Sequence, residues 1–592
     1  MNTESVIKSH ITDTVRELYP DIPDGAVQIQ KTRKEFDGDY TLIVFPLLKW
    51  TRKSPEQTAK DFGDRLLERM DDLIESINVV KGFLNIKLKN SYWLQQLSEY
   101  LEDKNFGFFE PTNMRFVIEY SSPNTNKPLH LGHIRNILLG WSVANILKAC
   151  GHEVIKVNLV NDRGIHICKS MVAWLNFGNG ETPELAGKKG DHLAGDYYVK
   201  FDKEYKSQIK ELVSGGMEQA EAENAAPIFE EAREMLRKWE ARDPATIALW
   251  EKMNGWVYDG FDETYRKLGV SFDKTYYESD TWLQGKKIVE KGLSKGIFFR
   301  NDDGSVWIDL TDDGLDRKLL LRSDGTSVYM TQDLGTAEQR FNEYRFDKMI
   351  YVVGNEQNYH FQALKLILRK LGYSMSDNIY HLSYGMVELP EGKMKSREGS
   401  VVDADDLIEE MIRTAGEVSR ELGKLNEMTC EEAGRIVDMI GLGALKYFIL
   451  KVDPKKTMLF NPKESIDFNG NTASFIQYTH ARIKSVLRKN EEAQFMRRMN
   501  GAVLDSKESE LIKLMESFPE TVRLAGENFS PALIANYTYD LAREYNQFYH
   551  DSPILKEENT ANRNMRLALS YQVAEILKKG MYLLGISVPE KM

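Results

Sequence analysis

The sequence predicts an α/β protein: a split, doubly wound parallel sheet forms its central part, an α+β part precedes it and an all-helical part follows it. Two observations support this prediction. Short β-branched runs alternate with amphipathic helical patterns over 115–160 and again over 326–387, as in strand–helix–strand units of parallel sheets. From residue 403 onward, almost every segment has helical periodicity.

Composition limits the class of protein. The chain has 592 residues, a formal net charge of −12, 42% hydrophobic and 28% charged residues, which excludes wholesale disorder. Its three cysteines, Cys150, Cys168 and Cys430, form no Cys-x-x-Cys pair, so we expect neither a disulfide framework nor a bound metal. We expect a cytoplasmic protein without membrane contact, since no apolar run of about 18 residues occurs. Taken alone, the acidic balance argues weakly against a nucleic-acid partner.

The N-terminal α+β part is predicted to span 1–110. A helix is expected over Glu4–Tyr19, and Ser54 followed by proline has the pattern of a helix cap. Val79–Leu88 reads as one strand.

The central part begins with a predicted βαβ unit. Phe116–Tyr120 is a strand, Pro123–Pro128 is a loop, a helix follows and ends at Gly151, and Glu153–Val160 is the next strand.

The alternation then breaks and resumes. Residues 170–270 are charged and mostly helical, and Phe298–Leu310 reads as a hairpin. The resumed strands are expected at Thr326–Met330, Met349–Val353 and Ile379–Val387, and the helices at Asp333–Tyr344 and Tyr359–Leu371. We therefore predict one Rossmann-like domain over 111–402 with an insertion at about 165–320, a helical connector over 403–465 and a helical domain over 466–592.

The first motif that carries chemistry is His130-Leu131-Gly132-His133, between the first strand and its helix. Doubly wound folds bind nucleotides at this edge of the sheet, and a helix N-terminus attracts phosphate. Gly132 allows close approach of a ligand, and two imidazoles can donate hydrogen bonds to a developing pentacovalent phosphate. The alternative, two unrelated histidines near a helix start, is disfavoured by the position of the motif.

The second motif is Gly392–Gly399, which follows the last predicted strand and carries three cations, Lys393, Lys395 and Arg397. A glycine-flanked basic loop suits a triphosphate whose pyrophosphate must leave. Alone it would read as a solvated basic loop; together with the first motif it favours a nucleotide site.

The two motifs resemble the HIGH and KMSKS signatures of class I aminoacyl-tRNA synthetases. Neighbouring segments are similar to the arginyl-tRNA synthetase family over essentially the whole chain. They are 119–124, 127–130, 161–162, 190–198, 322–326, 329–333, 354–360 and 584–592. The resemblance implies a ligase that activates L-arginine with ATP and Mg2+ and transfers it to tRNA(Arg), working as a monomer and usually requiring bound tRNA for activation. Another HIGH-superfamily nucleotidylyl transferase, or a non-catalytic tRNA-binding relative, remains an alternative.

The resemblance also implies site residues. The HIGH region comprises Pro123, Asn124, Thr125, Asn126, Lys127, Pro128, Leu129, His130, Leu131, Gly132 and His133. ATP would be bound by His130, Gly132, His133, Lys393 and Met394, and arginine by Glu119, Ser121, Asn124, Tyr329, Asp333 and Gln357. The residues expected to contact tRNA are Asp39, Tyr40, Tyr537, Asn546 and Met592.

One departure from the family pattern concerns catalysis. The second lysine of the KMSKS signature is replaced by Ser396, and Lys395 is displaced by one position. Lys127, just before the HIGH motif, matches a lysine that family members lacking the second one commonly carry. Either Lys127 or Lys395 is therefore expected to join Lys393, His130 and His133 in catalysis.

The arginine-binding assignments have structural alternatives. Carboxylate and amide oxygens suit the five-donor guanidinium fork, which the family meets with Tyr329, Asp333 and Gln357, while Asn124 and Ser121 lie near the amino and carboxylate groups. Asp333 could instead cap a helix, Glu119 could form a structural ion pair, and Tyr329 could belong to the core.

The predicted helix Tyr537–Tyr549 resembles the anticodon-binding helix of the family, and tyrosines can stack on unpaired bases. Leu541, Tyr545 and Phe548 fall at i, i+4 and i+7 and are expected in the core, which leaves Tyr537 and Asn546 as candidates.

Overall fold

The computed structural model describes residues 3–33, 35–388, 402–425, 428–489, 499 and 501–592. The chain forms two compact units, each built from segments that are distant in sequence. The first unit contains 1–106, 482–519 and 540–576, and the second contains 107–481, 520–539 and 577–592. The four-part division made from the sequence stays a prediction.

The first unit contains a four-stranded antiparallel sheet in the order β1–β2–β4–β3. Its strands are β1 (Gln28–Lys31), β2 (Tyr40–Ile43), β3 (Ile74–Val80) and β4 (Phe83–Leu88). Its N-terminal helical elements are α1 (Thr3–Leu18), η1 (Asp24–Ala26), η2 (Phe45–Leu47), α2 (Leu48–Thr51), α3 (Pro55–Arg69) and α4 (Asn90–Glu102). The predicted cap is confirmed, since the Ser54 side chain accepts a hydrogen bond from the backbone N–H of Gln57.

The prediction of one strand over 79–88 was wrong, because the chain reverses there. Lys81 and Gly82 have φ angles of 50° and 77° and join β3 to β4 as an antiparallel hairpin. A two-residue turn with positive φ at both positions matches the twist of the flanking strands.

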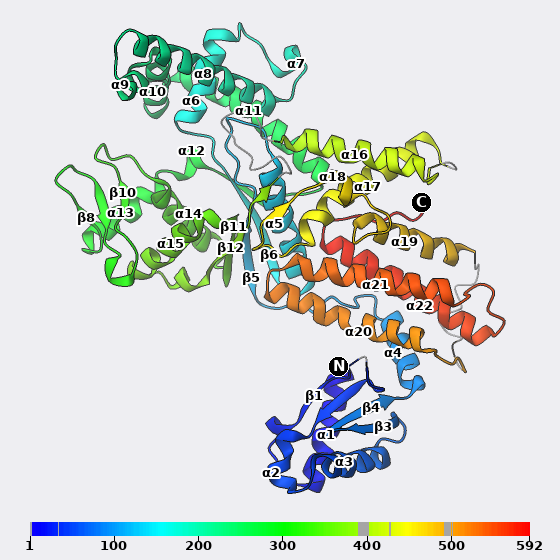
Figure 1. Ribbon diagram of the computed structural model, residues 1–592. Coiled ribbons are helices and arrows are strands. Elements are labelled where there is room, and N and C mark those ends of the chain that lie inside the picture. The colour runs from blue at the N-terminus through cyan, green and yellow to red at the C-terminus, as the bar shows by residue number, and fades with distance from the viewer. Residues whose placement is uncertain (1–2, 34, 389–401, 426–427, 490–498, 500) are drawn as a thin grey trace. The chain divides into compact units, whose positions relative to one another are not determined.

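The second unit is built on a five-stranded parallel sheet in the order β12–β11–β5–β6–β7 (Figure 1). The strands are β5 (Arg115–Glu119), β6 (Glu153–Val160), β7 (Lys274–Tyr277), β11 (Lys348–Gly354) and β12 (Ile379–Tyr384). All four pairings are parallel, which confirms the predicted sheet. Strand order reverses between β5 and β11, and in such folds the crevice at this point binds ligands.

The predicted strand Thr326–Met330 was wrong. Its β-branched residues resemble a strand, but Ser327 forms only an isolated bridge with Leu321, and α14 (Tyr329–Tyr344) begins directly afterwards. The strand of the parallel sheet that the sequence did not reveal is β7, which pairs with β6. Tyr329 and Asp333 consequently lie on the same helix, one turn apart.

The predicted hairpin and the predicted helical character of residues 170–270 are confirmed. Strands β8 (Phe299–Arg300) and β9 (Val306–Ile308) pair antiparallel, with β10 (Lys318–Leu321) beside them. The insertion helices are α6 (Ile165–Phe177), α7 (Pro183–Ala186), α8 (Gly190–Ser214), α9 (Gln219–Ala225), α10 (Pro227–Glu240) and α11 (Pro244–Leu268). They enclose an apolar core of their own, which includes Met171, Phe201 and Met253.

Smaller elements connect the sheet to the rest of the second unit. They are α12 (Glu278–Thr281), α13 (Gln284–Ser294), η3 (Thr311–Asp313), η4 (Asn355–Gln357), α15 (Asn358–Lys370), η5 (Ser374–Asn378) and the short strands β13 (Val387–Glu388) and β14 (Met458–Leu459).

From residue 403 the described chain is largely helical, as predicted. The helices are α16 (Ala404–Glu421), α17 (Cys430–Leu450), α18 (Pro462–Ser465), α19 (Ala473–Arg488), α20 (Ser506–Glu527), α21 (Pro531–Asp551) and α22 (Thr560–Leu583).

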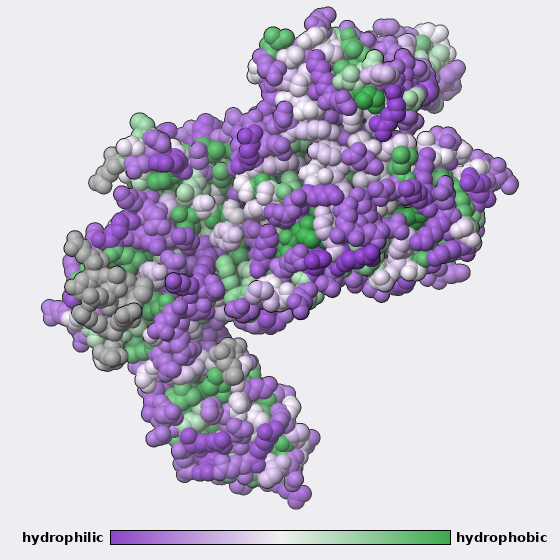
Figure 2. Space-filling model, turned by 180° about the vertical axis from the view of Figure 1, so that it is seen from behind, coloured by the Kyte–Doolittle hydropathy of each residue, from purple (hydrophilic) through white to green (hydrophobic). Residues whose placement is uncertain are grey.

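The described residues include no helix that combines the length and apolar character needed to cross a membrane. Figure 2 shows hydrophilic residues over most of the face that it presents, with apolar groups scattered among them.

Helix α5 (Leu131–Ala149), which begins within the HIGH motif, packs directly on the end of β5. A Cβ atom added to Gly140 would lie 2.4 Å from Cβ of the fully buried Tyr120. Glycine at this position therefore allows the close approach of α5 to the strand end that carries the candidate site.

We predict that Gly140→Ala destabilises the second unit by about 1–3 kcal/mol, because overpacking outweighs the gain in helix propensity. Thermal unfolding of the full chain measures the effect. Gly434→Ala is the matched control: it also lies inside a helix, but an added Cβ there meets nothing within 4 Å. Unfolding of Gly140→Ala at the wild-type temperature would contradict this packing argument.

Candidate active site

Two imidazoles cap the N-terminus of α5. Nδ1 of His130 accepts a hydrogen bond from the Gly132 N–H, and Nδ1 of His133 accepts one from the His130 N–H, each at 3.2 Å. The ring centroids lie 3.9 Å apart. Since a neutral imidazole that accepts at Nδ1 carries its proton on Nε2, both histidines keep an Nε2–H donor for a ligand.

Both histidines are held neutral. Burial, aided by the Lys127 ammonium, lowers the pKa of His130 to about 4. Burial, with His130 and Lys127 as further causes, lowers the pKa of His133 well below its usual value. Burial also lowers the pKa of Lys127. The HIGH motif is therefore a pair of uncharged donors at a helix N-terminus, beside one lysine.

The structure gives a second reason for glycine at position 132, which the sequence did not reveal. A Cβ at this position would lie 3.0 Å from Cε1 of His130, whose ring folds back over the first turn of the helix. The glycine thus makes room for the capping imidazole, in addition to its predicted role beside ATP.

Three predicted residues of the second motif, Lys393, Met394 and Lys395, lie outside the described residues. The described chain on both sides of the motif is bonded to the first two turns of α5. The Leu131 N–H donates to the Val402 carbonyl at 3.2 Å, and the fully buried Arg135 donates to the Met386 carbonyl at 3.2 Å.

Glu119 lies at the carboxyl end of β5 and is buried. Its Oε2 forms an ion pair with Nη1 of Arg340, and its Oε1 accepts a hydrogen bond from the Ser122 hydroxyl at 3.1 Å. The structural alternative considered for Glu119, an ion pair, is thus present.

Ser121 and Asn124 follow Glu119 in the same loop. Ser121 is buried with a φ of 81°, its hydroxyl lies 2.6 Å from the Tyr265 hydroxyl, and its N–H donates to Asn136 at 2.6 Å. Asn124 is exposed and forms a backbone bridge with Asn161 on the neighbouring chain segment. Of the two, Asn124 has the more accessible side chain.

The residues predicted for the guanidinium group meet at the same edge of the sheet. Tyr329 opens α14 and is 73% exposed, which excludes the core alternative. Asp333 lies one turn later, inside the helix, so the cap alternative was wrong. Its Oδ2 lies 2.6 Å from Nε2 of His360 on α15. Gln357 follows β11 in η4, beside the start of α15.

Glu278 is a site candidate that the sequence reasoning missed. It follows β7 directly, and its Oε1 accepts a hydrogen bond from Nε2 of Gln332 at 2.6 Å. Burial raises the pKa of Glu278 to about 7, with the charges of Asp162 and Asp333 contributing. The run Lys274–Tyr277 would have indicated this strand end.

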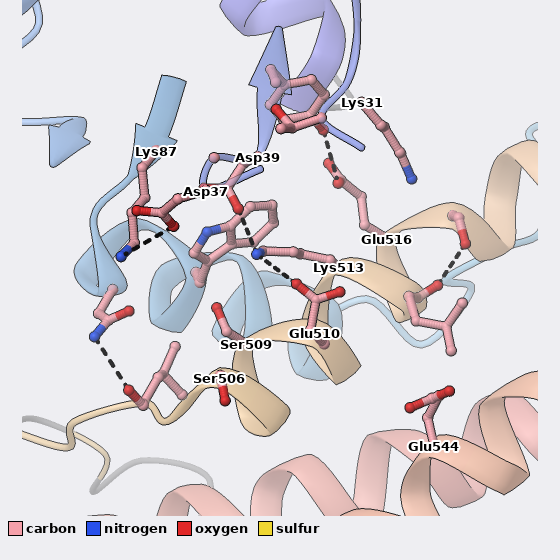
Figure 3. A pocket seen from close by; sticks show the side chains of 18 of the residues that line it. Lys31, Asp37, Asp39, Lys87, Ser506, Ser509, Glu510, Lys513, Glu516 and Glu544 are labelled. Atoms are coloured by element: carbon pink, nitrogen blue, oxygen red, sulfur yellow. Dashed lines mark hydrogen bonds and ion pairs between the residues drawn. The ribbon is translucent and has the colours of Figure 1, made fainter. Parts of the chain in front are cut away.

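Asp39 and Tyr40, predicted to contact tRNA, border a pocket of about 790 Å³ within the first unit (Figure 3). Lys513 of α20 lies 2.5 Å from Asp39, and the buried Tyr40 hydroxyl donates to Glu516 at 3.3 Å. Both side chains are thus engaged within the protein, and their contact with tRNA stays a prediction.

The structure describes the other residues predicted to contact tRNA, and their contact with tRNA stays a prediction. Tyr537 is 7% exposed, Asn546 accepts a hydrogen bond from Arg482, and Met592 is partly exposed. The core assignment made on the same helix is confirmed, because three side chains are fully buried: Leu541, Tyr545 and Phe548.

Within the described residues, one group of three side chains could hold a metal ion by spacing alone: Asp191, His192 and Asp405. Lys189 forms an ion pair with Asp405, and the Lys267 ammonium lies 3.5 Å from the same carboxylate. The positive charges of these two lysines already offset the negative charges of the two carboxylates, so we interpret the group as an ion-pair network rather than a metal site.

Comparison with known families accounts for most of the chain after residue 95. Residues 96–461 match the catalytic domain of the class I tRNA synthetases for arginine, and residues 476–592 match the DALR anticodon-binding domain.

Relatives agree over their full length. The chain is 60% identical to an arginine–tRNA ligase of Bacteroides thetaiotaomicron, covering all of both chains, and 54% identical to one of Flavobacterium psychrophilum, with the same coverage. The arginyl-tRNA synthetase structure of Thermus thermophilus matches with a TM-score of 0.78 and 26% identity over all of both chains. With this site at the switch point of its parallel sheet, the chain belongs to the class I arginyl-tRNA synthetases.

Proposed function

We propose that this arginine–tRNA ligase activates arginine at the carboxyl edge of β5 and β11, with His130 and His133 as donors to the α-phosphate of ATP. The carboxylate of arginine attacks this phosphorus and pyrophosphate leaves. A hydroxyl of the 3′-terminal adenosine of tRNA(Arg) then attacks the carbonyl of the arginyl-adenylate, and AMP leaves. The observation that carries the proposal is the pair of Nδ1 caps, which aims two neutral Nε2–H donors from a helix N-terminus.

Lysines neutralise the leaving pyrophosphate in this proposal. Lys127 lies just before the HIGH motif, and its charge contributes, after burial, to the lowered pKa of both histidines. This proximity to His130 and His133 supports a role for Lys127 beside the leaving pyrophosphate. Lys393 and Lys395, with Met394 beside ATP, would act from the other motif. Substitution of each lysine in turn measures how much it contributes to the rate of arginine activation.

Three carboxylates receive arginine. Asp333 and Glu278 bind the guanidinium group, supported by Tyr329 and Gln357, because two carboxylates meet its planar donor fork better than one. Glu119, at the end of β5, accepts the α-ammonium group. Ser121 and Asn124 complete the site near the amino and carboxylate groups.

Mg2+ accompanies ATP as a ligand of its phosphates and of water, rather than in an all-protein cage. We further propose a monomeric cytoplasmic enzyme with no tightly bound metal. In it, Asp39, Tyr40, Tyr537, Asn546 and Met592 contribute to tRNA binding.

ATP–pyrophosphate exchange with each amino acid, with and without tRNA, tests the proposed reaction. We expect exchange with arginine only, and dependence on tRNA. Exchange specific to another amino acid would overturn the substrate assignment, whereas strong exchange without tRNA would overturn only the tRNA dependence.

We predict that Lys127→Ala lowers kcat for arginine activation about 100-fold, as expected when one preorganised electrostatic group is lost. Lys188→Ala, which removes an exposed lysine paired with Asp196, is the control and should leave the rate unchanged. A wild-type rate for Lys127→Ala would refute the role of Lys127 and leave Lys395 as the candidate for the second lysine.

We also predict a pH-dependent KM for arginine. Glu278 binds a guanidinium only when ionised, and its pKa is raised to about 7, so KM should rise as pH falls from 8 to 6, by up to about tenfold per unit below pH 7. Glu278→Gln should give a high KM without this dependence, in aminoacylation at saturating ATP and tRNA. The exposed Glu290→Gln should keep the wild-type profile, and an unchanged profile in Glu278→Gln would refute the assignment.

A further inference from the structure

Arg340 is a fully enclosed arginine in the interior of the catalytic part. It lies on α14, is 0% exposed, and its guanidinium forms an ion pair with Glu119. It also lies over the rings of Tyr276 and Tyr351, at 4.8 and 5.7 Å from their centroids. Nothing in the proposed reaction uses this cation directly.

The position of Arg340 relates it to the proposed substrate residues. Tyr329, Asp333, Thr336 and Arg340 recur at i, i+4, i+7 and i+11, so they share one face of α14. Glu119 at the end of β5 is in register with Tyr351 of β11, whose ring Arg340 contacts. One helix face therefore presents Asp333 near its start and Arg340 two turns further on, against Glu119.

We propose that Arg340 is a positioning residue that presents the Glu119 carboxylate to the α-ammonium group of arginine. This inference rests on the proposed role of Glu119. Arg340 takes Oε2, while Oε1 is turned to Ser122 and the loop that carries Asn124. A guanidinium cannot lose its proton in a protein, so Arg340 holds a permanent positive charge against the Glu119 carboxylate.

Energetics favour a role beyond structure. A buried ion pair is often no more stabilising than apolar side chains of similar volume, whereas removing one partner leaves a buried charge without compensation. The sheet and α14 could pack through apolar groups, as they do around Val117 and Leu334 in the same core. The presence of the Arg340–Glu119 pair in this core is explained if the Glu119 carboxylate must be held in one fixed orientation.

The test compares two ligands of the full-length enzyme by calorimetry: L-arginine and 5-guanidinopentanoic acid, which lacks the α-amino group. The measured quantity is the ratio of their dissociation constants. In Arg340→Met we expect the preference for L-arginine to fall about 10- to 100-fold, as for loss of a hydrogen bond to a charged group, while KM for ATP stays unchanged. Arg340→Lys, which keeps the charge but not the planar fork, should retain part of the preference.

Arg566→Met is the matched control, because Arg566 is a buried arginine paired with Glu508 at 2.6 Å and Glu557 at 2.8 Å in the first unit. It should lower thermal stability without changing the ligand ratio. Reduced stability of Arg340→Met with an unchanged ratio would overturn the proposal. Should Arg340→Met fail to fold, an unchanged ratio in Arg340→Lys does the same.

Glu119→Gln separates this inference from the proposed function. Loss of the preference in Glu119→Gln but not in the Arg340 variants would leave Glu119 as the ammonium acceptor and remove Arg340 from the site. Retention of the preference in Glu119→Gln would overturn both roles.

Discussion

The two hydrogen bonds by which His130 and His133 cap α5 are the constraint on which the rest of the site depends. They fix both tautomers, satisfy N–H groups at the helix start and direct two uncharged donors outward. Because α5 begins where strand order reverses, these donors meet the crevice formed by β5 and β11. The Leu131 N–H donates to the Val402 carbonyl, and the Arg135 side chain donates to the Met386 carbonyl, so the described chain on either side of the lysine motif is attached to the start of α5.

The proposed arginine-binding side of the site is organised by charge. Glu119, Asp333 and Glu278 supply three carboxyl groups, and Arg340 neutralises one of them inside the protein. In the proposed complex, arginine adds two cationic groups and one carboxylate, which leaves one net negative charge among these groups when all three carboxylates are ionised. The overall charge of −12 says little about this balance, since fields at a binding site depend on local groups within a few ångströms.

Much of the fold was predictable from local patterns. β5, β6, β11 and β12 have apolar, β-branched sequences, and the Ser54 cap and the hairpin near Asn301–Gly304 carry local turn signals. The errors have a common cause. Thr326–Met330 has strand-like composition but lacks a neighbouring strand along its length, whereas Lys274–Tyr277 has a parallel partner, β6, more than a hundred residues earlier. Missing β7 also meant missing Glu278, because a residue can be assigned to the carboxyl end of a strand only when the strand itself has been identified.

The sequence by itself determined the family, the reaction class and the residues of the HIGH region, because these depend on short motifs whose chemistry is local. It also identified Asp333 and Tyr329 as arginine-binding candidates. Only the tertiary structure decided which groups contact the candidate carboxylates. His360 lies beside Asp333, Gln332 donates to Glu278, and Arg340 pairs with Glu119. Each of these pairs joins residues of two different elements. Such pairs depend on how the sheet brings distant segments together, which spacing along the chain does not encode.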